Sequence, residues 1–296
     1  FDPLDILLTE AHSRGLSFEG WINPYRLQAS ASSPGTLAAD NLANTHPDWV
    51  AAAGGGLYLN PAIPEAAAYV VEGVAELVRT YPVDGVHFDD YFYPTTDPAI
   101  DAARFAASGA ADLAEWRRQN VTALVKAAHD AVKAADPTLR FGVSPQGNPD
   151  NDMSQQYSDV RGWLAAGSED AVVDYLCPQL YWGYGYTLSN GSRRFAYENI
   201  LAEWLAMPRG SAALYVGLGA YRIGEGDGGS NGDSVSGWST GRALADQVGT
   251  LRAAGAGGYA LYRYGSLFQN TAWPQLAEAE CAALTAANAP DGGRAG

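Results

Sequence analysis

The segment Asp84–Pro94 carries the residues best suited to chemistry in this 296-residue chain. It reads Asp-Gly-Val-His-Phe-Asp-Asp-Tyr-Phe-Tyr-Pro, a short strand pattern over residues 85–88 that ends in Asp89 and Asp90. Aspartate is a poor strand former, and catalytic groups of parallel barrels lie at the carboxyl ends of strands. We therefore interpret the pair as catalytic carboxylates. The alternative is that one of them caps the loop or helix that follows.

Alternation along the strand separates the two carboxylates. Neighbouring strand residues point to opposite faces, so Asp89 shares a face with His87, and Asp90 shares one with Phe88. On a regular strand they are therefore not expected to flank a single bond. We take Asp89 as the principal carboxylate, a nucleophile or base, and Asp90 as a group that orients the site. A bulge at the strand end would change this assignment.

A partner for the principal carboxylate stays open. Glu19 lies within a strand pattern and suits either an acid or a buried partner of an arginine. Asp150 and Asp152 lie on the loop that follows another strand, either near the site or in solvent. Asp174 precedes its strand and is interpreted as a structural turn or cap.

Aromatic and polar residues recur at the ends of the predicted strands. Sugar binding uses aromatic faces for stacking and planar polar groups for hydroxyls. Each residue alone could equally pack in the core, but their repetition at successive strand ends favours a binding rim. The predicted binding residues are Asn23, Tyr25, Tyr91, Tyr93, Ser144, Gln146, Gln179, Tyr181, Trp182, Tyr221, Tyr262 and Arg263.

Strand and helix patterns alternate along the chain, which predicts an α/β fold with a parallel sheet. The predicted strands are Leu16–Trp21, Gly85–Phe88, Arg140–Ser144, Tyr175–Leu180, Leu214–Leu218 and Gly258–Leu261, with a small rim strand at Leu57–Leu59. The predicted helices include Glu65–Thr80, Asp112–Ala135, Arg193–Leu205 and Thr240–Ala254. Short turns lead into the strands and long segments leave them, as in a (β/α)8 barrel.

Composition excludes several classes of function. A net charge of −15 leaves no basic footprint for nucleic acid, and no run of 18 apolar residues is present to span a membrane. Cys177 and Cys281 set no disulfide framework, and no Cys/His cluster indicates a metal site. The glycine-rich stretches lack the context of a phosphate loop, so no cofactor is expected. The oligomeric state stays open.

A set of motifs, taken in order, resembles one family. The motifs are Asp2–Leu4, Trp21–Arg26, His46–Val50, Tyr58–Pro61, Asp84–Pro94, Trp116–Val121, Phe141–Pro145 and Asp174–Trp182. Together they resemble the bacterial glycosyl-hydrolase-like family ten over about residues 1–267. The resemblance implies a (β/α)8 TIM-barrel glycosidase fold with a catalytic domain over residues 1–285 and a flexible tail over 286–296. It also implies that the first two βα units are missing from this chain.

The resemblance further implies a polysaccharide substrate outside the cytoplasm, because family members are often exported. At least one bacterial member acts on peptide-free peptidoglycan glycan strands. Two other readings are a glycan-binding barrel without turnover and a metal-dependent polysaccharide deacetylase. Hydrolysis measured beside binding separates the first from an enzyme, and sensitivity to EDTA separates the second.

Overall fold

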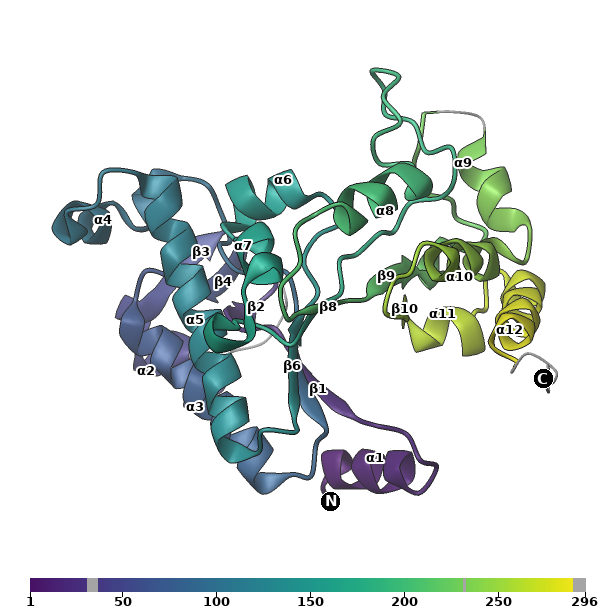
Figure 1. Ribbon diagram of the computed structural model, residues 1–296. Coiled ribbons are helices and arrows are strands. Elements are labelled where there is room, and N and C mark those ends of the chain that lie inside the picture. The colour runs from purple at the N-terminus through teal and green to yellow at the C-terminus, as the bar shows by residue number, and fades with distance from the viewer. Residues whose placement is uncertain (31–36, 231–232, 290–296) are drawn as a thin grey trace. The chain divides into compact units, whose positions relative to one another are not determined.

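The computed structural model describes residues 1–30, 37–230 and 233–289 and is an α/β protein (Figure 1). The chain forms two compact units. The first comprises Phe1–Pro145, Pro149–Leu176 and Arg209–Ala212, and the second comprises Gln146–Asn148, Cys177–Pro208 and Ala213–Gly296. The predicted boundary of a single catalytic domain at residue 285 stays a prediction.

The first unit is built on a parallel sheet. Its helices and strands are α1 (Pro3–His12), β1 (Glu19–Ile22), β2 (Arg26–Gln28), α2 (Leu42–Thr45), β3 (Val50–Ala53), β4 (Gly56–Leu59), α3 (Pro64–Thr80), β5 (Gly85–Phe88), α4 (Ala102–Ser108), α5 (Leu113–Ala135), β6 (Arg140–Val143), α6 (Pro149–Asn151), α7 (Val160–Ala165) and β7 (Tyr175–Leu176). Within this unit the sheet order is β1-β5-β6-β7, with all pairs parallel. A separate antiparallel sheet has the order β2-β4-β3.

One face of the parallel sheet packs on α3 and α5. A side chain at Gly20 would meet Leu77 of α3, and the ring of Phe141 contacts His129 of α5. Phe88 is fully buried and packs edge-on against Phe141. Burying these aromatic side chains on the helices stabilises the sheet and leaves its other face to Glu19, His87 and the residues aligned with them.

Helices α3 and α5 begin within one residue of the positions that the sequence predicts. Pro64 occupies the first turn of α3, where its missing N–H costs nothing. Asp112 caps α5 by accepting a hydrogen bond from the Glu115 N–H at 2.9 Å. Asp136 follows the last residue of α5 and precedes Pro137, which disfavours helix at that position.

Two aspartates that precede strands each accept a hydrogen bond from a backbone N–H of a neighbouring segment. Asp84 Oδ2 accepts the Phe18 N–H at 2.6 Å, and Asp174 Oδ2 accepts the Phe141 N–H at 2.7 Å. Burial raises the pKa of Asp174, but hydrogen bonds from His129, Lys133 and the Phe141 N–H outweigh it and lower that pKa to about 2. The prediction that Asp174 is a structural turn residue is confirmed.

The second unit contains the remaining elements. They are α8 (Tyr197–Leu205), β8 (Ala213–Leu214), β9 (Val216–Gly219), α9 (Asp233–Ser236), α10 (Ala243–Ala253), β10 (Tyr259–Tyr262), α11 (Tyr264–Phe268) and α12 (Pro274–Asn288). Strand β10 pairs with β9 in parallel, with Tyr262 opposite Gly219. The buried carboxylate of Glu280, on α12, accepts the N–H groups of Ala243 and Leu244 and so caps α10.

Five predictions of strand and helix extent were wrong. Strand β1 begins at Glu19 rather than at Leu16, and helix α10 begins at Ala243 rather than at Thr240. The strand expected over Tyr175–Leu180 ends at Leu176, and Pro178, which has no N–H for a ladder, follows two residues later. The strand expected over Leu214–Leu218 is divided into β8 and β9 at Tyr215. Helix α8 begins at Tyr197 rather than at Arg193.

The C-terminal end of the chain is only partly a predicted tail. Helix α12 includes residues 286–288 of the predicted tail, whereas residues 290–296 lie outside the described part of the chain. Within the described residues, no helix is long and apolar enough to cross a membrane.

Candidate active site

Register places three of the predicted site residues side by side. Ile22 lies opposite Phe88, and Phe88 lies opposite Val143. Both ladders continue for one more residue, because the Asp89 N–H donates to the Ile22 carbonyl at 3.1 Å and the Ser144 N–H donates to the Phe88 carbonyl at 2.9 Å. Asn23, Asp89 and Ser144 therefore occupy the same level at the carboxyl ends of β1, β5 and β6. This is the edge at which parallel barrels carry catalytic groups.

Asp89 and Asp90 are both buried, with 8% and 6% of their surface exposed. The Asp90 N–H donates to Asp89 Oδ1 at 2.9 Å, and the Phe92 N–H donates to the Asp90 carbonyl at 3.1 Å. The backbone thus turns sharply after β5 and fixes the Asp89 carboxylate. A carboxylate held by a backbone donor is suited to act as a nucleophile or base without reorganising.

Asn23 offers an open donor beside this carboxylate. Its Oδ1 accepts the Arg26 N–H at 3.3 Å, which fixes the orientation of the amide. Its Nδ2 is buried and has no partner among the described residues. A buried donor without an acceptor costs about 1–3 kcal/mol, so a ligand oxygen that accepts this N–H would gain that energy.

A series of hydrogen-bonded polar side chains lies on the face of the sheet that His87 shares with Asp89. Tyr175 extends its ring across Gly142, where any side chain would clash with it, and its hydroxyl lies 2.8 Å from His87 Nδ1. The same hydroxyl donates to Glu19 Oε2, and Glu19 Oε1 pairs with Arg140. Glu19 is therefore the partner of an arginine, the second of its two predicted roles.

The hydrogen bonds assign the tautomer of His87. The Tyr175 hydroxyl donates its hydrogen bond to the Glu19 carboxylate. The hydroxyl oxygen must therefore accept the hydrogen bond from His87, so His87 is protonated at Nδ1. Burial lowers the pKa of His87 to about 4, although the negative charge of Asp89 acts in the opposite direction. The interaction with Asp89 fits the prediction that both side chains share one face.

Burial of neutral His87 makes stability fall in acid. The unfolded chain, with a His87 pKa near its ordinary 6.5, binds a proton more readily than the folded chain, so the contribution is complete above pH 6.5. This contribution to the free energy of unfolding is lost as the pH falls from 6.5 toward 4, and the loss is about 2 kcal/mol at pH 5. We expect His87→Asn to flatten this part of the curve in denaturant unfolding at pH 7, 6 and 5. Tyr175→Phe, which keeps the burial, should retain the slope, and an unchanged slope in His87→Asn would contradict the assignment.

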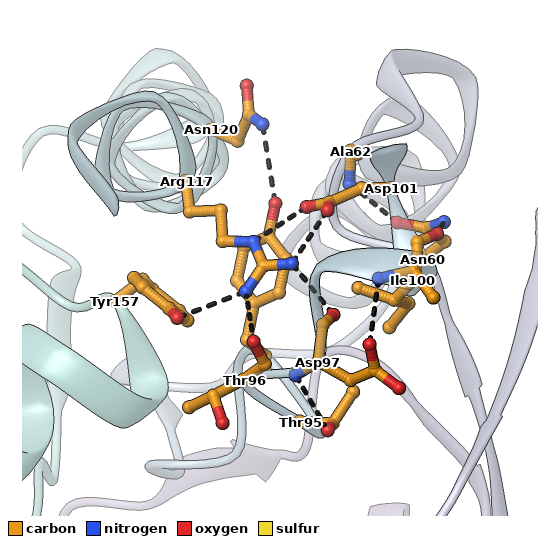
Figure 2. Close-up of polar contacts among 12 residues, drawn as sticks. Asn60, Ala62, Thr95, Thr96, Asp97, Ile100, Asp101, Arg117, Asn120 and Tyr157 are labelled. Atoms are coloured by element: carbon orange, nitrogen blue, oxygen red, sulfur yellow. Dashed lines mark hydrogen bonds and ion pairs between the residues drawn. The ribbon is translucent and has the colours of Figure 1, made fainter. Parts of the chain in front are cut away.

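A buried arginine holds the loop that leaves β5 (Figure 2). Arg117, on α5, has no exposed surface and forms a bidentate ion pair with Asp101, at 2.8 Å from Nε and 2.6 Å from the terminal nitrogen. Its remaining N–H groups donate to the carbonyls of Thr96 and Asp97 and to the Tyr157 hydroxyl. All five guanidinium donors are thus used, and four of the five acceptor atoms belong to Thr96, Asp97 and Asp101.

Aromatic rings complete this cluster. Tyr93 and Tyr157 pack edge-on, and the Arg117 guanidinium lies 5.0 Å from the centroid of each ring. Asn120, also on α5, donates to the Tyr93 hydroxyl at 3.4 Å (Figure 2). The segment from Asp89 to Asp101 is therefore fastened at its far end to α5. Arg117 thus restrains the loop that begins at the carboxylates.

The predicted tyrosines of the first unit separate by exposure. Tyr91 is 45% exposed and lies under the Arg26 guanidinium, 5.3 Å from its ring centroid. Tyr25 and Tyr93 have 0% and 2% of their surface exposed. Tyr91 thus presents a face for stacking, whereas the burial of the other two favours a supporting position.

Three predicted residues of the second unit form one aromatic cluster. Tyr181 stacks on Tyr262 at 5.9 Å, and both rings meet Tyr221 edge-on at 5.5 and 6.1 Å. Tyr262 is the last residue of β10, Tyr221 comes two residues after β9, and Tyr181 comes five residues after β7. Tyr262 is 45% exposed, so the cluster offers at least one open aromatic face.

The other predicted residues of this unit lie at neighbouring strand ends. Gln146 and Gln179 form an isolated parallel bridge, and Gln179 forms another with Gly217. Trp182 stacks on Phe195 at 5.1 Å, and a side chain at Gly147 would meet its ring. Arg263 follows β10 directly and lines a cavity with Tyr221.

Metal binding has no geometric support among the described residues, in which no group of three or more His, Cys, Asp or Glu side chains is placed to hold an ion. Asp150 and Asp152 are the two loop carboxylates considered above as partners of Asp89. Asp150 pairs with Arg161 at 3.1 Å, and Asp152 is fully buried.

Comparison with known proteins identifies the family. The model of the family described as Glycosyl hydrolase-like 10 matches residues 1–231. The chain belongs to this family. It is 37% identical to Glycosyl hydrolase YngK of Bacillus subtilis (strain 168) over 246 residues, which is 75% of this chain and 46% of that protein. It is 34% identical to Glycosyl hydrolase DigH of Escherichia coli (strain K12) over 255 residues, or 76% of this chain and 55% of that protein.

The chain thus spans about half the length of these relatives. Among solved structures it is similar to α-L-fucosidase isoenzyme 2 from Paenibacillus thiaminolyticus, with a TM-score of 0.55 and 17% identity over 95% of this chain and 39% of that one. This similarity and similar ones to chitinases identify the fold as the glycosidase type of TIM barrel, which confirms the predicted fold class.

The sequence analysis did not predict the residues that hold other parts of the site in place. Trp116–Val121 was quoted only as a motif, although Arg117 within it fastens the loop after β5. The signal was an arginine near the start of a helix, on a face that is otherwise apolar, because an arginine buried there requires an acidic partner. Trp273 and Glu225 were also missed, because they lie in segments without strand-end periodicity.

Proposed function

We propose that this protein is a glycoside hydrolase in which Asp89 is the principal carboxylate. The observation that carries the proposal is the alignment of Asn23, Asp89 and Ser144 at the carboxyl ends of three adjacent parallel strands. Asp89 acts either as the nucleophile that attacks the anomeric carbon or as the base that removes a proton from the water that attacks it, and Asp90 holds the turn that positions Asp89. The names of the family and of the relatives support the same class of reaction.

Glycoside hydrolysis usually requires two carboxyl groups, about 5–5.5 Å apart for retention of configuration and 6.5–9.5 Å apart for inversion. Asp90 is the neighbouring carboxylate within the predicted pair, and its buried position fits a group that orients the site. Sugar units stack on Tyr91, while Asn23 Nδ2 donates to a sugar oxygen. Within the second unit, the cluster of Tyr181, Tyr221 and Tyr262 offers an aromatic surface of its own for sugar stacking.

We further propose that the substrate is a bacterial polysaccharide outside the cytoplasm, with peptide-free peptidoglycan glycan strands as the first candidate. Mass spectrometry of the products released from such strands tests the proposal, with chito-oligosaccharides as a second substrate. Short oligosaccharides that carry one added water per cleavage are expected from the parent protein and not from Asp89→Asn. Intact glycans after prolonged incubation with the parent would contradict it.

A glycan-binding barrel without turnover is the second candidate, because the acid partner of Asp89 is not identified. Equilibrium binding measured beside cleavage separates the two: retained binding with no products supports the second candidate. Loss of activity in EDTA, together with release of acetate, would instead support a metal-dependent deacetylase.

A further inference from the structure

A cavity of about 550 Å³ lies in the second unit, where the chain leaves β9 and β10. Most of its lining is polar, in contrast to the alanine-rich groove of the same volume between α3 and α5. The residues that matter for its chemistry are Tyr221, Glu225, Arg263, Gln269, Asn270 and Trp273. Aromatic faces, amides and one cation around a cavity of this size fit a sugar unit better than an apolar ligand.

Arg263 differs from the other arginines of its unit. The other arginines described in this unit donate to a carboxylate, a carbonyl or an amide oxygen: Arg193, Arg194, Arg222, Arg242 and Arg252. The Arg263 side chain has no such partner among the described residues, and it lines the cavity. Arg263 is exposed, so its guanidinium is open to an anionic ligand in a chain whose net charge is −15. Its planar fork can bind a carboxylate through two parallel hydrogen bonds.

Trp273 is held as a stacking surface. Its indole N–H donates to Glu225 Oε1 at 2.9 Å, and its backbone N–H donates to Asn270 Oδ1 at 2.8 Å. Gly224 has a φ of +74°, and a side chain there would meet the indole at 2.4 Å, so the ring lies directly against the backbone. Trp273 remains 40% exposed. The ring is therefore oriented before any ligand binds, which lowers the entropy cost of stacking.

We propose that this cavity is a subsite for a sugar unit that carries a carboxylate. The Arg263 guanidinium binds the carboxylate, the Trp273 indole stacks on the sugar ring, and the Gln269 amide faces its hydroxyls. The Asn270 amide is engaged by the Ser266 carbonyl and the Trp273 N–H, so it holds the indole in place. Glu225 fixes the indole, and its own negative charge confines the favourable position for an anion to the Arg263 side of the cavity. This inference rests on the proposed glycan substrate and names its chemical class.

The test compares two probes that differ only in charge. Peptide-free peptidoglycan oligosaccharides bear a lactyl carboxylate, and the same oligosaccharides after conversion of that group to its methylamide are neutral. Isothermal titration with Asp89→Asn protein prevents turnover during the measurement. We expect the acidic probe to bind at least about tenfold tighter than the amide, as for a charge-assisted hydrogen-bonded pair.

Three variants in the same Asp89→Asn background identify the residues. Arg263→Gln is expected to weaken binding of the acidic probe about tenfold and to leave the amide unchanged, whereas Trp273→Ala weakens both probes to a similar extent. Arg242→Gln removes a surface arginine of the same unit that pairs with Asp246, and it should change neither affinity. Circular dichroism confirms that each variant is folded.

Equal affinities of the parent for both probes, no binding of either, or an unchanged preference in Arg263→Gln would each overturn the subsite. The proposed hydrolase activity fails separately. Charge-selective binding by a protein that releases no products keeps the subsite and rejects the hydrolase. Cleavage at equal rates of acidic and neutral glycans by parent and Arg263→Gln keeps the hydrolase and rejects the subsite.

Discussion

Replacing Asp89 with asparagine is expected to lower the rate of glycan cleavage by about 10³-fold or more, because the amide can act neither as a nucleophile nor as a base. Folding should be almost unchanged. The asparagine Oδ1 can still accept the Asp90 N–H, which is the contact that Asp89 makes at the turn after β5. Initial rates on end-labelled, peptide-free glycan strands measure the effect, and denaturant unfolding measures stability.

Two further variants make the result specific. Asp97→Asn is the matched control, since Asp97 lies on the same loop and caps the turn over residues 98–100 through a bond that asparagine also accepts. It should cleave at the parent rate. Asp90→Asn should reduce the rate only through misplacement of Asp89, with a partial loss. A normal rate in Asp89→Asn would end the assignment, and a severe loss in Asp90→Asn alone would transfer the role to Asp90.

Replacing Arg117 with methionine is expected to lower the free energy of unfolding by about 3–5 kcal/mol, because one half of a buried ion pair is left uncompensated. Asp101 and Arg117 both have fully buried side chains, so water cannot take the place of the guanidinium. The carbonyls of Thr96 and Asp97 and the Tyr157 hydroxyl lose their donors at the same time. Urea unfolding followed by tryptophan fluorescence measures the change.

The neighbouring arginine provides the control. Arg118 pairs with Glu115 at 2.8 Å, and the Glu115 side chain is 52% exposed, so Arg118→Met should cost less than about 1 kcal/mol. The double variant Arg117→Met/Asp101→Leu should recover much of the loss, because no buried charge remains. Equal stabilities of Arg117→Met and Arg118→Met would contradict the role of the cluster.

The same cluster should influence catalysis through the loop. Arg117→Lys keeps the charge but cannot supply five donors, so it serves if Arg117→Met does not fold. We expect faster amide hydrogen exchange over residues 91–101, a lower kcat and a smaller change in KM. A stability loss without faster exchange in this loop would indicate a general packing role instead of a positioning one.

Local pattern was sufficient where one residue's neighbours along the chain determine its conformation. Strand β5 has the predicted bounds, and α3 and α5 end where predicted. The signals are local: apolar periodicity marks all three elements, Pro64 marks the start of α3, and Asp136 marks the end of α5. Pro178 is a local signal for the early end of β7 that the prediction over Tyr175–Leu180 did not use. The break at Tyr215 had no such signal, because it depends on which strands β8 and β9 pair with, and pairing is set by contacts far away in the sequence.

The family and the candidate carboxylates follow from the sequence alone, because a motif such as Asp84–Pro94 combines residue types that strand propensity disfavours. Only the tertiary structure decided how the candidates divide. Strand register aligns Asn23 and Ser144 with Asp89. Side-chain packing pairs Glu19 with Arg140. It also buries Tyr93 beneath Arg117 and leaves Tyr91 exposed. Sequence alternation specifies which face a strand residue occupies, but partner identity and burial arise from segments that meet only after the chain has folded.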